Sequence, residues 1–262
     1  MPIISPHLVY ELTKRSQLLS RALSLLEEDS ELQSYLRMAN VMAVERLGYN
    51  DHGVVHSRIV AGSALLMAEI LLKRGVRFSI VENRIGTPED ARLVVLAGAY
   101  LHDVGNSIHR ELHHIHGCLI ADPILRRLLL KIYGGKSTKA ILVKQEILHC
   151  IFSHDESVKP LSVEAGIVKV ADGTDMAEGR ARIPFRRGKV DIHALSALAI
   201  KRVLVEEGEE RPIRIVVDME NEAGVFQVEK VLGEKIRSSS IASYVEVTVL
   251  KKGFELKRMV EW

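Results

Sequence analysis

An uncharged apolar run from Leu93 to Leu101 constrains the fold more than any other feature, because so long an apolar stretch has to be buried. Residues 87–90, Thr-Pro-Glu-Asp, precede the run and have the signature of a helix start. They provide a capping hydroxyl, a proline in the first turn and acidic side chains at the positive end of the helix dipole. The run ends at the pair His102–Asp103. The sequence therefore predicts a buried helix whose C-terminal end carries an imidazole and a carboxylate.

The residues up to about 208 show helical spacing of apolar side chains, with capping residues and glycines at the breaks. Besides the helix that starts after residue 87, helices are expected at residues 8–26, 32–47, 54–73, 117–133, 137–153, 162–176 and 194–206. This pattern predicts a mainly α fold, with an all-helical domain over residues 1–208.

The pattern changes in residues 209–262. Residues 213–217 are rich in β-branched side chains and residues 244–249 alternate with a period of two, which indicates two strands, and a third short strand is expected at 254–257. Residues 225–236 return to helical spacing. We expect a small α+β domain over residues 209–262 with a regulatory or dimerisation role. So short a unit buries little core and leaves strand edges unpaired, so a homodimer is expected.

Composition excludes several classes of protein. Of the 262 residues, 47% are hydrophobic and 27% are charged. The net charge of +2 lacks the large basic excess that is typical of proteins that bind polyanions, so nucleic acid is not an expected partner. Residues 1–10 do not resemble a signal peptide, and no run of about 18 uncharged apolar residues predicts a membrane span. Cys118 and Cys150 lie in apolar surroundings, which is typical of reduced cysteines in a cytoplasmic protein.

Further metal-binding residue types flank His102 and Asp103 on both sides. Imidazole and carboxylate bind divalent transition metals without redox-labile sulfur. The candidates are His52, His56, His116, His149, His154 and Asp172. Such an array can coordinate one or two ions, and its nitrogen-rich donors favour Mn, Fe, Co, Ni or Zn over Mg.

Spacing ranks some of these histidines. His52 and His56 are four residues apart and share a helix face if one helix includes both, although His52 could equally be a loop or capping residue. His149 and His154 are five apart, about 140° around a helix, so they cannot both face one metal unless the helix ends between them. His154 lies at such a break, and His149 is expected to be a packed residue. Asp172 ends an apolar stretch as either a helix cap or a ligand.

Four histidines lie within residues 109–116, and not all of them can be ligands. His116 directly precedes Gly117 at the start of an apolar helix, so its side chain is expected to lean inward. His109, His113 and His114 are expected at the entrance, where they hold phosphate oxygens or are simply solvated. Arginines after Asp172 can bind phosphate in a bidentate manner, or lie in a solvated loop. The sequence contains no complete phosphate-binding loop, no serine nucleophile motif and no cysteine zinc pair.

Taken together, the array resembles the HD-domain superfamily of metal-dependent phosphohydrolases. Five short motifs carry the resemblance in the correct order, at residues 56–61, 101–105, 116–121, 151–156 and 170–172. The resemblance implies an all-helical HD-type domain and covers none of residues 210–262. It also implies a basic metal set of His56, His102, Asp103 and Asp172.

In superfamily members with two ions, the aspartate corresponding to Asp103 bridges them, and two histidines that match His116 and His154 hold the second ion. Many members carry lysine where this chain has Asn106. Arg110, Arg180 or Arg182 is therefore expected to contact phosphate. His52 and His113 complete the expected substrate-binding residues.

The expected activity is hydrolysis of a phosphoester or phosphoanhydride in a small phosphorylated substrate, with a nucleotide favoured. A metal-activated hydroxide attacks phosphorus, and Asp103 and His102 are the expected catalytic residues. Two alternatives remain open: a di-iron oxygenase on the same scaffold and a non-catalytic nucleotide sensor. All candidate ligands precede residue 180, so residues 209–262 are expected to be dispensable for metal binding.

Overall fold

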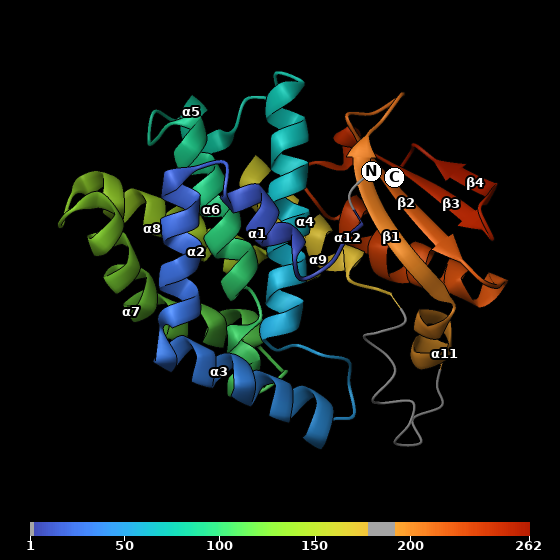
Figure 1. Ribbon diagram of the computed structural model, residues 1–262, viewed down its shortest axis with the longest axis horizontal. Coiled ribbons are helices and arrows are strands. Elements are labelled where there is room, and N and C mark those ends of the chain that lie inside the picture. The colour runs from blue at the N-terminus through green and yellow to red at the C-terminus, as the bar shows by residue number, and fades with distance from the viewer. Residues whose placement is uncertain (1–2, 178–191) are drawn as a thin grey trace.

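The computed structural model describes residues 3–177 and 192–262 of the chain. Helices of the first range form a bundle, and a small sheet with its own helices lies at one side of it (Figure 1). The bundle comprises α1 (Leu8–Thr13), α2 (Gln17–Glu28), α3 (Ser30–Asn40), α4 (Val54–Lys73), α5 (Ser79–Glu82), α6 (Pro88–Leu101), α7 (His113–Tyr133), α8 (Thr138–Ser153) and α9 (Val163–Thr174). A π-helical segment, η1 (Val41–Arg46), and a 3-10 helix, η2 (Val104–Ser107), connect some of them.

Helix α6 is the central helix of the bundle, as its apolar run predicts. Every residue from Leu93 to Leu101 is buried, and α4, α8 and α9 pack around it. The predicted start is confirmed as a capping box, in which the side chains of Thr87 and Asp90 each bind the other residue's backbone N–H. Close packing needs glycine at position 98, because a Cβ there would lie 2.6 Å from Cβ of Cys150 on α8.

Helix α4 has the length and hydropathy of a membrane span, but 67% of its apolar window is buried inside the protein. It is the one such helix among the described residues, and it packs on α1, α6 and α9 as a core helix. Its composition therefore reflects burial on most of its surface within the bundle.

The C-terminal unit, residues 192–262, combines a four-stranded sheet with short helices. Its elements are α11 (Ile192–Leu198), β1 (Ile200–Glu207), β2 (Ile213–Met219), η3 (Glu222–Gly224), η4 (Gln227–Leu232), α12 (Gly233–Arg237), η5 (Ala242–Tyr244), β3 (Val245–Lys251) and β4 (Phe254–Met259). The strand order is β1-β2-β3-β4, in which β2 and β3 are parallel and the other pairs are antiparallel. Segments η4 and α12 make the crossover that a parallel pair requires.

The predicted helix over residues 194–206 is wrong beyond Leu198. The chain turns there and forms β1, which pairs along its length with β2 and buries Val203, Leu204 and Val205. This pairing outweighs the helical spacing of the apolar residues. Strand pairing is a long-range interaction, so the local periodicity of the sequence does not reveal it. The sheet consequently begins before residue 209, where the boundary was expected.

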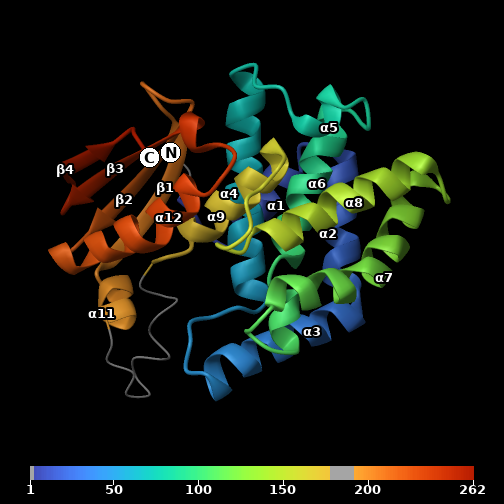
Figure 2. The ribbon, with the colours of Figure 1, turned by 180° about the vertical axis from the view of Figure 1, so that it is seen from behind.

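The sheet and the bundle share one continuous hydrophobic core. Apolar residues of β1, β2 and β3 belong to the same buried cluster as those of α4 and α6. The N-terminal segment strengthens this connection, because Ile3 forms a β-bridge with Leu204 and the N–H of Ile4 donates to the carbonyl of Val203. In both views α9 lies between the bundle and the C-terminal unit (Figures 1 and 2).

Candidate metal centre

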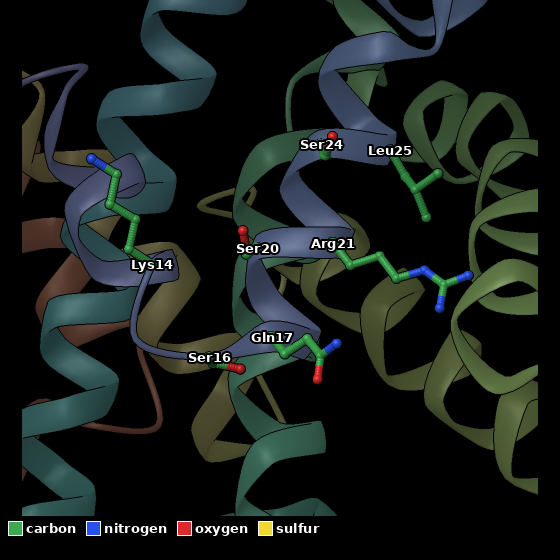
Figure 3. Close-up of a pocket in the computed structure, with 7 residues that line it drawn as sticks. All are labelled: Lys14, Ser16, Gln17, Ser20, Arg21, Ser24 and Leu25. Atoms are coloured by element: carbon green, nitrogen blue, oxygen red, sulfur yellow. The ribbon is translucent and has the colours of Figure 1, made fainter.

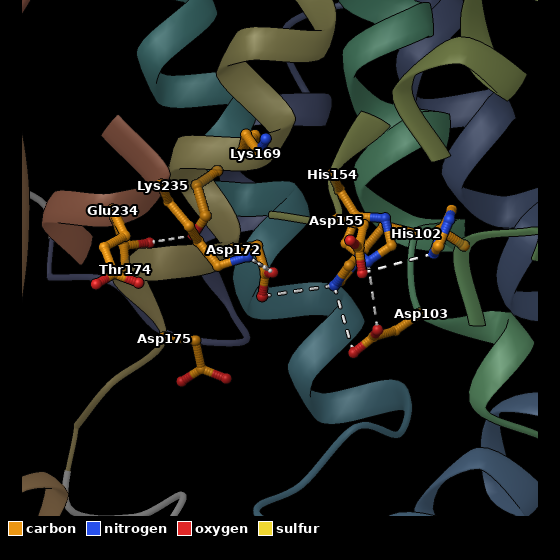
Figure 4. A network of polar contacts seen from close by, with 12 residues as sticks. His102, Asp103, His154, Asp155, Lys169, Asp172, Thr174, Asp175, Glu234 and Lys235 are labelled. Carbon is orange, nitrogen blue, oxygen red and sulfur yellow. Dashed lines mark hydrogen bonds and ion pairs between the residues drawn. The ribbon is translucent and has the colours of Figure 1, made fainter. Parts of the chain in front are cut away.

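Six histidines and aspartates meet inside the bundle, and we refer to them as the metal centre; five are buried, and the side chain of Asp172 is 12% exposed. They come from the ends or interiors of five helices: His56 on α4, His102 and Asp103 at the end of α6, His113 at the start of α7, His154 at the end of α8 and Asp172 on α9. Figure 4 shows part of this arrangement, with His102, His154 and Asp103 facing one another. Donor atoms of these residues form three groups that could each hold an ion.

The first group is His56, His102 and Asp103, and Asp172 completes the basic set that the resemblance implies. The Nε2 atoms of His56 and His102 lie 3.1 Å apart. Oδ1 of Asp172 is 3.2 Å from the first nitrogen and 3.6 Å from the second. Oδ2 of Asp103 lies 3.4 Å and 3.5 Å from the same two nitrogens. Atoms that coordinate one ion at about 2.1 Å lie about 3.0–3.4 Å apart, so this donor set fits a single divalent ion.

The second group lies on the other side of the Asp103 carboxylate. Oδ1 of Asp103 is 3.6 Å from Nε2 of His113 and 3.6 Å from Nε2 of His154, and these two nitrogens are 3.0 Å apart. The two oxygens of Asp103 therefore face two different pairs of histidines. A carboxylate in this position can bridge two neighbouring ions.

Hydrogen bonds orient each histidine with Nε2 toward the centre. Nδ1 donates to the backbone carbonyl three residues earlier in His102 (2.7 Å), in His113 (3.0 Å) and in His154 (2.6 Å). Nδ1 of His56 instead donates to Oδ2 of Asp175 at 2.6 Å. Because carbonyls and carboxylates only accept, the proton is on Nδ1 and the lone pair of Nε2 is available to a metal, the usual arrangement of ligand histidines.

Electrostatics favour the metal-binding protonation states of His113, His154 and Asp103, and act in the opposite direction on His102. Burial and the neighbouring His154 lower the pKa of His113 to about 3, and burial also lowers the pKa of His154. Burial alone would raise the pKa of Asp103, but His102 and His52 outweigh it and hold this pKa well below its ordinary value. Burial disfavours charge on His102, yet the carboxylates of Asp103 and Asp172 raise its pKa.

Polar neighbours fix the two ligand carboxylates. The side-chain amide of Asn106 donates to Oδ1 of Asp103 at 2.7 Å, so the residue that replaces the superfamily's lysine supports a ligand. Nζ of Lys235, on α12, lies 2.7 Å from Oδ2 of Asp172. Sequence reasoning missed Lys235, and it missed Asp175 as the partner of His56.

The prediction for His116 needs correction, because the structure brings His113 into the metal centre instead. His116 belongs to none of the possible metal-binding groups among the described residues, and its Nδ1 has no hydrogen-bond partner. Helix α7 starts at His113, four residues earlier than predicted, after Leu112 with a φ of 56°. His113 therefore shares a helix face with Gly117, and that face packs on Gly105, where a Cβ would lie 1.9 Å from the carbonyl oxygen of His113.

The other predicted residues lie around the centre. Nε2 of His52 is 3.9 Å from Oδ2 of Asp103. A guanidinium nitrogen of Arg110 is 3.7 Å from Oδ1 of the same carboxylate, and 40% of this side chain is exposed. His149 is packed away from the centre, as predicted, and its Nε2 accepts from the N–H of Leu161. Arg180 and Arg182 lie outside the described residues.

A separate hollow lies on the outer surface at the start of α2. It is lined by Lys14, Ser16, Gln17, Ser20, Arg21, Ser24 and Leu25. Figure 3 shows the side chains of Lys14 and Arg21 pointing away from each other. No residue of the metal centre lines this hollow.

Comparison with known proteins agrees with this geometry. Residues 53–177, which match the HD domain family, include the entire metal centre. An uncharacterized protein of Methanocaldococcus jannaschii, MJ1020, is 49% identical over 222 residues, which are 85% of this chain and 85% of that protein. Ribonuclease Y of Protochlamydia amoebophila is 27% identical over 181 residues, which are 66% of this chain and 31% of that protein. No solved structure matches the chain significantly. The chain thus contains an HD domain, at residues 53–177.

Proposed function

We propose that the protein hydrolyses a phosphoester or phosphoanhydride bond with the help of one or two divalent transition-metal ions. One observation carries this proposal: the two oxygens of Asp103 face two different pairs of histidines. This arrangement supports two adjacent ion positions that share one carboxylate. The first position would be held by His56, His102, Asp103 and Asp172, and the second by Asp103, His113 and His154.

The metal supplies the main chemistry when it is bound, because it lowers the pKa of a coordinated water and neutralises charge on a phosphoryl oxygen. The protein's own residues then orient the reactants. Asp103 lies at both positions, so it can orient a water molecule beside them. The orientation of His102 is fixed by the carbonyl of Ala99. These two residues are the proposed catalytic pair.

The proposed substrate is a small phosphorylated molecule, and a nucleotide is our first choice. Arg110 supports the phosphate, because its partly exposed guanidinium lies between the metal centre and solvent. His52, at the margin of the centre, is a second polar contact. The net charge of +2 favours a small anion over a nucleic acid. The partial likeness to Ribonuclease Y makes a phosphodiester in RNA the alternative to test.

Two other activities are less well supported. A non-catalytic sensor does not require a full ligand set, yet all six donors converge here. A di-iron oxygenase would use the same histidines and aspartates, and it would require redox-active iron and O₂. Nitrogen-rich donors favour Mn, Fe, Co, Ni or Zn, and these five metals are the proposed cofactors.

We also propose a cytoplasmic location and a homodimeric state. Both cysteines are free in the structure, which suits a reducing compartment. Strand β4 forms an edge of the sheet, and its residues Phe254 and Leu256 are exposed. A second copy that covers this edge would remove an unpaired strand from solvent.

The proposal is tested by metal analysis combined with a substrate screen. Protein produced in medium that contains all five metals should carry about one to two ions per chain. It should release inorganic phosphate from members of a panel of nucleotides and other phosphorylated metabolites, whereas cleavage of short RNA into smaller oligonucleotides would support the phosphodiester alternative. Asp103→Ala should lose metal and activity together, while His149→Ala, outside the centre, should keep both. Absence of metal in the wild-type protein would refute the proposal, and iron-dependent O₂ consumption without phosphate release would favour the oxygenase.

A further inference from the structure

The C-terminal unit reaches the metal centre through one buried lysine. Lys235 on α12 is only 8% exposed, and its ammonium lies 2.7 Å from Oδ2 of Asp172, 63 residues away in the sequence. Figure 4 shows Asp172 between Lys235 on one side and His102 on the other. A buried ammonium costs free energy unless it is paired, and the carboxylate of Asp172 provides the pairing.

Two glycines on α9 bring the C-terminal unit into direct contact with this helix. A Cβ at position 173 would lie 3.2 Å from Cδ of Lys235, and a Cβ at position 166 would lie 2.2 Å from Oγ of Ser240. The hydroxyl of Ser240 also donates to the backbone carbonyl of Ser162 at 2.6 Å. The stem of Lys235 is therefore packed against α9, and its approach to Asp172 is set by backbone packing as well as by charge.

The pairing divides the two oxygens of Asp172 between two roles. Oδ1 faces the Nε2 atoms of His56 and His102, at 3.2 Å and 3.6 Å, and Oδ2 is held by Lys235. An oxygen that accepts from an ammonium is a weaker metal ligand than a free oxygen. A second buried cation lies nearby, because Lys169 on α9 carries an ammonium that donates to the carbonyl of Val158 at 2.7 Å.

We propose that Lys235 is a positioning residue of the metal centre, which limits Asp172 to one coordinating oxygen and adds positive charge that favours an anionic ligand at the open coordination position. This inference rests on the metal centre proposed above. A cation a few ångströms from a divalent ion repels it, so Lys235 lowers metal affinity. The same charge attracts phosphate. Lys235 would thus lower the affinity for the metal ion. It would also leave a coordination position on that ion which an anion can occupy.

The test uses full-length Lys235→Met and Lys235→Gln proteins, with Lys235→Arg to restore the charge. Lys230→Met is the matched control, because Lys230 lies on the adjoining segment η4 and is largely exposed. Both neutral variants should bind Co²⁺ at least about tenfold more tightly than the wild-type protein. In Lys235→Met the visible absorption of bound Co²⁺ should weaken, because Asp172 then coordinates with both oxygens. Inorganic phosphate should perturb that spectrum only at higher concentrations than in the wild-type protein.

Lys235→Arg and Lys230→Met should remain close to the wild-type protein in Co²⁺ affinity, spectrum and phosphate response. Thermal unfolding identifies the variants that fold, and Lys235→Gln decides the matter if Lys235→Met does not. Unchanged or weaker Co²⁺ binding by a folded neutral variant would overturn the role of Lys235. A wild-type protein that binds no Co²⁺ would instead refute the metal centre itself, so the two failures are distinguishable.

Discussion

At the scale of single residues, helix ends set the geometry of the metal centre. His102, His113 and His154 each lie at a helix end, and their Nδ1 atoms donate to the carbonyl three residues earlier. Carbonyls at such positions are available because the regular helical bonding pattern is incomplete there. The backbone thereby holds each imidazole with Nε2 inward, and only His56 needs a carboxylate, that of Asp175, for the same purpose.

Removal of the second pair of histidines should separate the two ion positions. His113→Ala and His154→Ala should each lower metal content from about two ions toward one, because Asp103 retains its other oxygen for the first position. His116→Ala should leave the metal content unchanged, since His116 lies outside the possible metal-binding groups. Elemental analysis of the purified variants measures this. A loss of metal in His116→Ala without a loss in His113→Ala would contradict our assignment.

Sequence reasoning identified most of this site but not all of it. His102, Asp103 and Asp172 attracted attention because they end apolar stretches, where a polar group needs a partner, and the resemblance to the superfamily implied the basic set as a whole, with His56. His113 was missed because Leu112 adopts a positive φ, which local patterns do not predict for leucine, and this shifts the start of α7. Gly105 could have indicated the correct start of α7, since a glycine beside a ligand pair can mark a place where two backbone segments approach closely.

At the scale of secondary-structure elements, α6 is fixed at the end remote from the metal centre. Asp90 completes the capping box of α6, accepts from the hydroxyl of Tyr133 at 2.6 Å and pairs with Lys139 at 2.7 Å. Burial alone would raise the pKa of Asp90, but Lys139, Tyr133 and Thr87 outweigh it and lower the pKa. The helix was predictable because its start signal and its buried run are contiguous, whereas β1 was not, because its partner strand β2 decides its conformation.

Loss of the Asp90 carboxylate should destabilise the protein in a pH-dependent manner. We expect Asp90→Ala to lower the free energy of unfolding by about 2 kcal/mol at neutral pH, since it removes a cap and its buried partners. The folded-state pKa lies below the ordinary value of 3.8, so the stabilisation is present above that pH and is lost as the pH falls through the folded-state pKa. Urea unfolding of both proteins at neutral and acidic pH measures the difference. A difference that does not shrink in acid would argue against the carboxylate as its source.

At the scale of the whole molecule, the bundle and the sheet share one hydrophobic core. Their apolar residues form one core, and Lys235 links the sheet side of the molecule to a ligand of the metal centre. The sequence could not predict this connection, because the partners are far apart and neither belongs to a recognisable motif. Because the two parts share a core, we expect residues 209–262 to be needed for the fold that holds the metal centre, although the sequence alone suggested that they are dispensable for metal binding.

A chain that ends at Gly208 should therefore fail to fold as a metal protein. Strand β1 would lose its pairing with β2, and the face of α9 that carries Gly166 and Gly173 would be exposed to water. We expect this chain to be largely insoluble, and its soluble fraction to bind no metal and to show no cooperative thermal unfolding. A soluble, cooperatively folding fragment with the metal content of the full-length protein would show that the bundle is independent of the sheet.

The pairing of Lys235 with Asp172 also has a consequence for synthesis on the ribosome. Every candidate metal ligand has left the exit tunnel well before the segment that covers α9 has been made. The nascent chain therefore passes through a stage in which all of its metal ligands have been synthesised but the C-terminal unit does not yet cover them. Premature termination between β1 and α12 would leave a product that carries all of these ligands and lacks the lysine that restrains one of them.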